Sequence, residues 1–403
     1  MARSYDMTKG SIWKNILCFS IPIMVSNLIQ STYNAVDMLF VGRFTGTESL
    51  AAVSVCGPIM NVMIITLSGM SAGVLVVISS LLGAGENTQA RDAAHTSLAL
   101  YAIMAAVLTL VGLAFTPQLL LAVQTPLSAM PEAKRYLYTV FAGMSFSFGY
   151  NLIGALQQAQ GNATASMSFV LISSIVNILL DAVLIVGLHM GALGAALGTV
   201  LAQFVAFCVG AVQFTHGNTV LQISLGEVRF HKKHLKNILL FGVPTAANEV
   251  MVNLAMLTVS GVANSFGLAS SAAYGVGSRI NSLAIFMDGA MNQTLSAYAS
   301  QNIGAKNKKR ALTGLWKAIA ISVSMALVSS LTVLVFAEDF AACFDANPEV
   351  VRQSAAFLRV TIWSYPLFAA VGPLIGFIRG TGNLEASLLV GVLAQLCGRI
   401  PAS

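Results

Sequence analysis

The sequence predicts an all-α protein that crosses a membrane many times. Of its 403 residues, 56% are hydrophobic and only 9% are charged, and the mean hydropathy is +0.79. A soluble domain carries about 25% charged residues, so this chain has too few charges to build a surface that faces water. Its apolar runs reach about 20 residues or more, which is the length of helix that crosses a bilayer. A transmembrane β-barrel would instead show short alternating strands.

Hydropathy divides the chain into apolar segments that we expect to be membrane-spanning helices. Their approximate limits are 16–41, 50–82, 96–115, 136–159, 166–188, 192–214, 237–262, 270–300, 311–335, 353–378 and 384–403. With the N-terminus in the cytoplasm, thirteen Lys and Arg residues fall in cytoplasmic loops and five in outer loops. This asymmetry predicts a multi-pass protein of the plasma (inner) membrane with a cytoplasmic N-terminus. It also explains the net charge of +6 without a nucleic-acid partner.

Four sequence motifs occur twice along the chain. The pairs are NILCFSIP and NILLFGVP at 15–22 and 237–244, SLAAVSV and SSAAYGV at 49–55 and 270–276, SSLLGA and SQNIGA at 79–84 and 300–305, and GNATAS and GNLEAS at 161–166 and 382–387. The offset is 222 residues for the first pair and 221 for the others. A constant offset over this distance indicates an internal repeat.

The repeat predicts two lobes of six helices each. An even number of spans returns the chain to its starting side, so the lobes are related by a pseudo-twofold axis along the membrane normal. We expect an N-terminal lobe at 1–214, a polar and basic cytoplasmic linker at 215–236, and a C-terminal lobe at 237–403. Ser403 corresponds to Ala182 of the first lobe, so we expect the sequence to be truncated by roughly 40 residues, including a twelfth helix.

Polar residues inside the first lobe form the first candidate site. An ionisable residue within a span is a functional candidate by default, and Asp37 and Asp181 lie in spans 1 and 5. Asn177 precedes Asp181 by four residues and shares its helix face, while Thr199 in span 6 adds a hydroxyl. These oxygen ligands suit Na⁺. They suit a proton equally well, because two close carboxyl groups in an apolar surround cannot both ionise easily. The alternative is a set of interhelical hydrogen bonds.

The candidate acids are distributed unequally between the two lobes. The repeat partner of Asp37 is Thr258 or Val259, so only the first lobe carries this acid. A purely structural role would be expected in both lobes.

The second lobe carries its own acids, Glu249 in span 7 and Asp288 in span 8. We expect them either to bind a cationic substrate or to pair with Arg279. Arg379 lies near a membrane end, where a long side chain can snorkel towards water.

The sequence contains no motif for catalysis or nucleotide binding. GxxxxGK[ST], HExxH and serine-hydrolase motifs are absent, so we expect neither an enzyme nor an ATP-driven pump, and no cofactor beyond a coupling ion. The five histidines lie in or near loops and are expected to be solvated. These are His95, His189, His216, His231 and His234.

Several segments together resemble the multidrug and toxic compound extrusion (MATE) family of antiporters. They are Pro22 through Asp37 into FVGR at 40–43, the GA-containing loops after spans 2 and 8, NILLD at 177–181 and RGTGN at 379–383. The resemblance covers the whole chain and implies twelve helices in two lobes. It also implies alternating access driven by Na⁺ or H⁺ and the export of cationic or amphipathic drugs.

The resemblance also bears on which residues bind the coupling ion. In one branch of the family the cation site is built in the N-terminal lobe, and Asp37, Asn177, Asp181 and Thr199 match its residues one by one. Another branch uses a span-7 Glu eight residues after a Pro and an acid in span 10. Here Glu249 follows Pro244 by five residues, and span 10 has no acid. We therefore favour the first site.

The resemblance also suggests which residues bind the substrate and which partners the protein has. Glu249, Asp288 and Asn34, which lies on a polar stripe leading to Asp37, are candidates for substrate binding. We expect a monomer that contacts drug-like molecules and membrane lipid.

The main alternative function is that of a lipid-linked sugar flippase of the wider superfamily. A second alternative is a receptor or assembly factor without transport. Twelve expected spans and a carboxylate cluster argue against the flippase, and the repeat with its unequal acids argues against the receptor.

Overall fold

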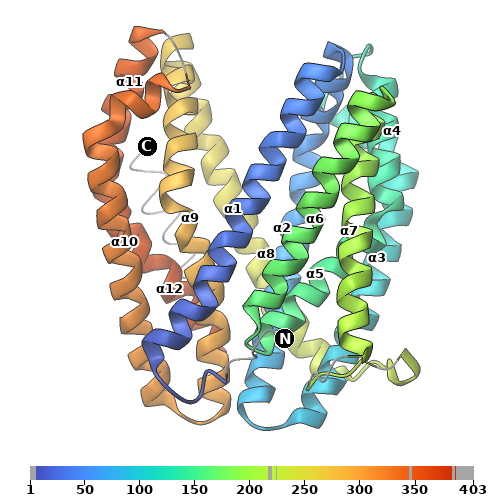
Figure 1. The fold of residues 1–403 in the computed structure, drawn as a ribbon, viewed down its shortest axis with the longest axis vertical. Helices are drawn as coiled ribbons and strands as arrows, with labels where there is room; N and C mark the ends of the chain where they lie inside the picture. The colour runs from blue at the N-terminus through green and yellow to red at the C-terminus, as the bar shows by residue number, and fades with distance from the viewer. Residues whose placement is uncertain (1–5, 217–219, 224, 345–346, 384–385, 387–403) are drawn as a thin grey trace. The chain divides into compact units, whose positions relative to one another are not determined.

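The computed structural model describes residues 6–216, 220–223, 225–344, 347–383 and 386, and these are helical almost throughout (Figure 1). The long helices of the first half are α1 (Ile12–Phe44), α2 (Thr47–Gly83), α3 (Asn87–Ala122), α4 (Met130–Ala142), α5 (Met144–Ala159), α6 (Ala163–Asp181) and α7 (Gly191–His216). Those of the second half are α8 (Lys232–Ser265), α9 (Leu268–Gly304), α10 (Lys308–Ala342), α11 (Pro348–Thr361) and α12 (Tyr365–Thr381). Short helical turns are η1 (Ala182–Gly187), η2 (Leu225–Glu227) and η3 (Ile362–Ser364).

The predicted spans correspond to these helices, apart from 384–403, which lies almost entirely outside the described residues. The span at 136–159 consists of α4 and α5, which are bent by 50° at their junction. By length and hydropathy, eight of the described helices could cross a membrane, or nine if this bent pair counts as one span. Helix α9 is not among them, and it carries Arg279, Asp288 and Asn292. The all-α fold class is therefore confirmed.

Packing divides the chain into two compact units. The first unit is Met1–Asp6 with Val25–Val243, and the second is Met7–Met24 with Pro244–Ser403. Both changes of unit fall inside a helix, between residues 24 and 25 of α1 and between residues 243 and 244 of α8. Pro22 and Pro244, which the repeat relates to each other, lie at these places. Proline removes a helical hydrogen bond and clashes with the preceding turn, so each helix can bend there.

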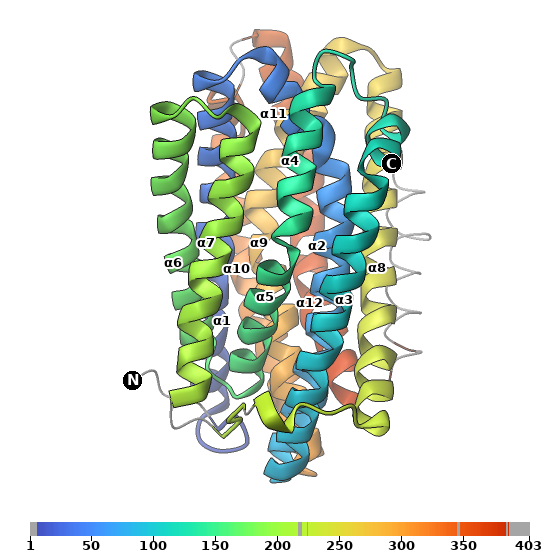
Figure 2. The same ribbon diagram turned by 90° about the vertical axis from the view of Figure 1, so that its right-hand side faces the viewer.

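In the first unit, the chain after α7 folds back onto the start of α3. The backbone N–H of His231 donates to Oγ1 of Thr96, which in turn donates to the carbonyl of Arg229. His95 is only 2% exposed and His234 only 5%. The expectation that the histidines are solvated is therefore wrong for these two, which lie on the two segments that pack together here, the start of α3 and the start of α8. Figure 2 shows α6 and α7 of the same unit running side by side.

In the second unit, α12 packs closely along α9. Gly372, Gly376 and Gly380 are spaced by four residues and therefore share one face of α12. A Cβ atom at Gly376 would clash with the carbonyl of Asn292, and one at Gly380 would lie 2.8 Å from the carbonyl of Ser296. Small residues let helix backbones approach each other in this way within a membrane.

Within the second unit, the segment directly before α1 is bonded to α9 and α10 through its backbone. The carbonyl of Met7 accepts hydrogen bonds from Asn302 Nδ2 (3.2 Å) and Arg310 Nε (3.3 Å). The carbonyl of Lys9 accepts one from Arg310 Nη2 (2.8 Å), and the N–H of Met7 donates to Gln301. These bonds attach the segment before α1 to α9 and α10.

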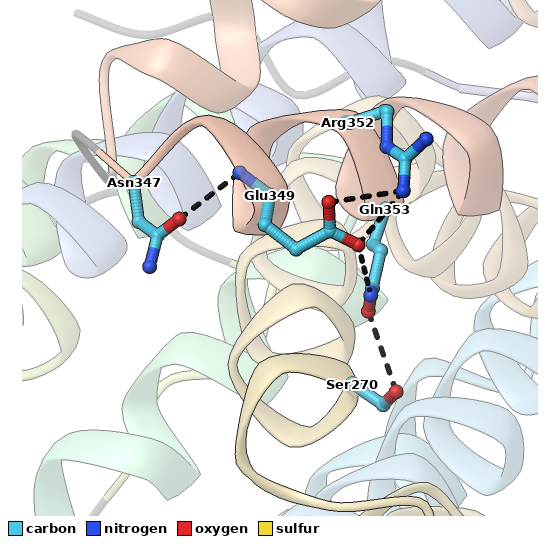
Figure 3. Close-up of polar contacts among 5 residues, drawn as sticks. All are labelled: Ser270, Asn347, Glu349, Arg352 and Gln353. Carbon is cyan, nitrogen blue, oxygen red and sulfur yellow. Dashed lines mark hydrogen bonds and ion pairs between the residues drawn. The ribbon is translucent and has the colours of Figure 1, made fainter.

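A polar cluster attaches the start of α11 to α9 (Figure 3). Asn347 caps α11 by accepting from the backbone N–H of Glu349. Arg352 and Gln353 both donate to the Glu349 carboxylate, at 2.9 and 2.7 Å. Ser270 of α9 donates to the side-chain oxygen of Gln353. The polar groups of this cluster form hydrogen bonds with one another, so we assign the cluster a structural role.

Candidate functional site

Helix α6 presents one polar face. Asn177 and Asp181 lie four residues apart, and Ser174 lies three residues before Asn177, so all three share that face. They are 2%, 0% and 3% exposed. The helix changes to π geometry directly after Asp181, in η1. Such π segments occur frequently at functional sites.

Asp37 is brought to this face by the second half of α1, which belongs to the same unit. Its carboxyl group and that of Asp181 are close enough to interact. Two tyrosines, Tyr33 of α1 and Tyr136 of α4, lie within electrostatic range of both carboxyl groups. The structure therefore brings Asp37 close to Asp181, with Asn177 one turn before Asp181 on the same helix face. Their role as a cation site stays a prediction.

Buried polar atoms gather in this cluster without partners. Among the described residues, six buried atoms of these side chains form no hydrogen bond of regular geometry. They are Oδ1 of Asp37, Oγ of Ser174, Oδ1 and Nδ2 of Asn177, and Oδ1 and Oδ2 of Asp181. Leaving such a group unpaired costs about 1–3 kcal/mol, and more if it is charged. A bound cation or a proton shared by the carboxyl groups would supply the missing partner.

The wall opposite Asp181 is formed by Gly198 of α7. A Cβ atom there would clash with Oδ1 of Asp181 and lie 3.5 Å from Nδ2 of Asn177. The absence of a side chain at position 198 therefore makes room for the carboxyl group. Thr199, the predicted ligand on this helix, is the next residue and is half-buried.

Sequence reasoning missed Ser174, Gly198 and the two tyrosines. Ser174 could have been found, because it lies on the helix face that Asn177 and Asp181 define. No local signal identifies the others. Asn34, one helix turn before Asp37, is exposed.

We expect Gly198→Ala to weaken cation binding while the protein still folds. The added methyl group must displace the Asp181 carboxyl group, whereas a binding geometry has to be held to about 0.5 Å. For a cluster that binds a cation, half-maximal binding should therefore require a roughly tenfold higher cation concentration or more. Gly57→Ala is the matched control, because a Cβ atom at Gly57 meets no atom of the described residues within 4 Å. An unchanged cation dependence in Gly198→Ala would contradict the proximity of α7 to the site.

The acids of the second unit lie in different surroundings. The carboxyl group of Asp288 lies against Gly372 of α12, and its Oδ1 is buried without a hydrogen-bond partner in the described part of the chain. Glu249 of α8 interacts with Arg379. Neither acid forms an ion pair with Arg279 among the described residues, so that expectation is not met.

Comparison with known proteins identifies relatives along nearly the whole chain. The family model described as MatE matches residues 22–183 and 244–402. The chain is 27% identical to the probable multidrug resistance protein YoeA of Bacillus subtilis (strain 168), over 98% of this chain and 87% of that protein. It is 24% identical to the multidrug export protein MepA of Staphylococcus haemolyticus (strain JCSC1435), over 95% of this chain and 85% of that protein.

Solved structures resemble this fold closely. One is described as the outward-facing conformation of a multidrug resistance MATE family transporter of the MOP superfamily. It is 25% identical, with a TM-score of 0.91, and the match covers 100% of this chain and 90% of that one. A crystal structure of MATE in complex with MaD3S is also 25% identical, with a TM-score of 0.93 and the same coverage.

Proposed function

Since this chain belongs to the MatE family of multidrug efflux transporters, we propose that it is a secondary antiporter, which exchanges a cationic or amphipathic drug for Na⁺ or H⁺. The chain is a multi-pass membrane transporter and not an enzyme. The coupling ion binds at Asp37, Asn177, Asp181 and Thr199. The ion is a substrate of the transporter, and no resident cofactor is involved.

The observation that carries the proposal is the cluster of buried polar atoms in the first unit that have no hydrogen-bond partner among the described residues. Carboxylate, amide and hydroxyl oxygens are ligands that hard cations prefer. Two carboxyl groups that interact can also retain one proton between them, because like charges disfavour each other's ionisation. Either occupant changes the net charge of the cluster, in which Asn177 and Asp181 are buried and Asp37 is half-buried.

Helix α1 supplies a route from ion binding to conformational change. Asp37 lies on its second half, in the first unit, while Met7–Met24 belong to the second unit. A shift of α1 in response to the charge at Asp37 is therefore passed along one continuous helix into the second unit. Pro22 gives the helix a place to bend. A ligand that prefers one bend shifts the population towards it, as alternating access requires.

The proposal also assigns the residues that bind the substrate, the oligomeric state and the orientation in the membrane. Glu249 and Asp288 of the second unit are the proposed contacts for a positively charged group of the drug. Asn34 of the first unit, which is exposed on α1, is a separate candidate for substrate binding. The transporter works as a monomer in the plasma membrane with its N-terminus in the cytoplasm, as the distribution of Lys and Arg predicts.

The test is drug efflux from vesicles that contain the purified protein. Efflux of a fluorescent cationic dye is measured at fixed pH with and without a Na⁺ gradient, and then at fixed Na⁺ with a pH gradient. Efflux that follows one gradient and stops when an ionophore collapses it identifies the coupling ion. Protein-free vesicles give the background. Absence of efflux under both gradients would refute the antiport function and favour the lipid-linked sugar flippase.

A further inference from the structure

The described part of the second unit contains a buried arginine that has no ion pair there. Arg379 lies near the end of α12 and is only 6% exposed. Its Nη1 donates a hydrogen bond to Oδ1 of Asn292 on α9 at 3.1 Å. Glu249 of α8 is within electrostatic range. Among the described residues, the ion pairs at 4.0 Å or less involve other arginines. The position of Arg379 near a membrane end suggests that it snorkels towards water, but the structure shows that it is buried.

One edge of this guanidinium is buried and unpaired among the described residues. The bond to Asn292 occupies Nη1 and leaves the edge formed by Nε and Nη2, and Nε is buried without a partner among the described residues. That edge is the one that binds a carboxylate through two parallel hydrogen bonds. A buried, unsatisfied charged donor is costly. An ionisable residue that is kept inside a span despite this cost points to a functional role.

The first half of the repeat solves the same packing problem without a charge. With the offset of 221 residues, Arg379 corresponds to Gln158 and Asn292 corresponds to Ser71. Gln158 donates to Ser166 at 3.1 Å, and the Ser71 hydroxyl bonds the Tyr101 hydroxyl at 3.0 Å. In the first half, both positions therefore carry neutral side chains that bond other neutral residues. The charge of Arg379 is specific to the second half.

We infer that Arg379, oriented by Asn292, is a binding site for a carboxylate group of an amphipathic substrate. The inference deepens the proposed transport function and rests on it. Glu249 is the internal counter-charge of this site. It lowers the cost of burying the guanidinium when no ligand is bound, and it competes electrostatically with the incoming carboxylate. Since a transporter moves through several conformations, a site that is closed in one of them can open in another.

The experiment compares two dyes that share a fluorophore and a positive charge. Rhodamine 110 carries a free carboxyl group, and rhodamine 123 is its methyl ester. Binding of each to the purified full chain in detergent is followed by fluorescence anisotropy. We expect the wild type to prefer the acid. Arg379→Gln should weaken binding of the acid roughly tenfold or more and leave the ester within about twofold. Arg379→Lys keeps the charge without the two-pronged geometry and should give an intermediate loss.

Two further variants keep the inference testable if Arg379→Gln does not fold. Asn292→Ala removes the acceptor that orients the guanidinium, so the ratio of acid to ester affinity should fall. Glu249→Gln removes the competing negative charge, so that ratio should rise. These opposite signs would not follow from a purely structural role.

The inference is overturned if the wild type does not bind the acid or binds both dyes equally. It is also overturned if the variants weaken both dyes by the same factor. A preserved affinity ratio without gradient-driven efflux would instead count against the antiport function and leave this site in place.

Discussion

Replacing Asp37 by Asn should abolish cation-driven efflux without unfolding the protein. The amide keeps the size of the side chain but removes the negative charge that faces Asp181. Losing a charge-assisted contact of this kind lowers affinity for a cation by roughly tenfold or more. The variant can also no longer take up and release a proton at this position. Both coupling mechanisms therefore fail in the same variant.

The stability of Asp37→Asn should move in the opposite direction from its activity. A buried carboxylate beside a second one destabilises the folded state unless an ion or proton compensates. The thermal midpoint in detergent without Na⁺ at neutral pH should therefore equal or exceed that of the wild type, which is the usual trade-off at a functional site.

The measurements are dye efflux under an imposed gradient and thermal unfolding of the same preparations. Asp339→Asn is the matched control, since Asp339 is exposed near the end of α10. The control should leave both measurements unchanged. Normal efflux in Asp37→Asn would show that the cation site does not lie in the first unit.

Replacing Gly376 by Ala should give the largest loss of stability of any substitution considered for this protein. The new Cβ atom would clash with the carbonyl oxygen of Asn292 and lie 2.9 Å from the carbonyl carbon. Backbone atoms cannot rotate away as a side chain can, so α9 and α12 must separate. Overpacking of this kind costs about 1–3 kcal/mol and sometimes more.

The matched control is Gly289→Ala on α9 itself. A Cβ atom there meets no atom in the described part of the chain within 4 Å, and alanine is about 0.5–1 kcal/mol better than glycine inside a helix. The thermal midpoint should fall in Gly376→Ala and stay the same or rise in Gly289→Ala. Equal midpoints in the two variants would show that the glycine face of α12 is not needed for packing.

The sequence alone determined the class of protein, the helices and the family. Hydropathy and the positions of charges can be read directly along the chain. A helix needs about 20 apolar residues to cross a bilayer. Because only 9% of the residues are charged, apolar segments of this length are easy to recognise in the sequence. The repeat followed from residue identities at a constant offset. Asp37, Asn177 and Asp181 could be selected because a charge inside a span is costly wherever its partners lie.

Tertiary structure decided which residues complete each site. Gly198 faces Asp181 only because α6 packs on α7, and the burial of His95 depends on a chain segment more than 130 residues away that folds over it. Arg379 could not be told from a snorkelling residue until α9 supplied Asn292. The change of packing unit inside α1 and α8 likewise depends on contacts between distant segments. Such contacts arise from the packing of helix faces, which a linear pattern of hydropathy does not encode.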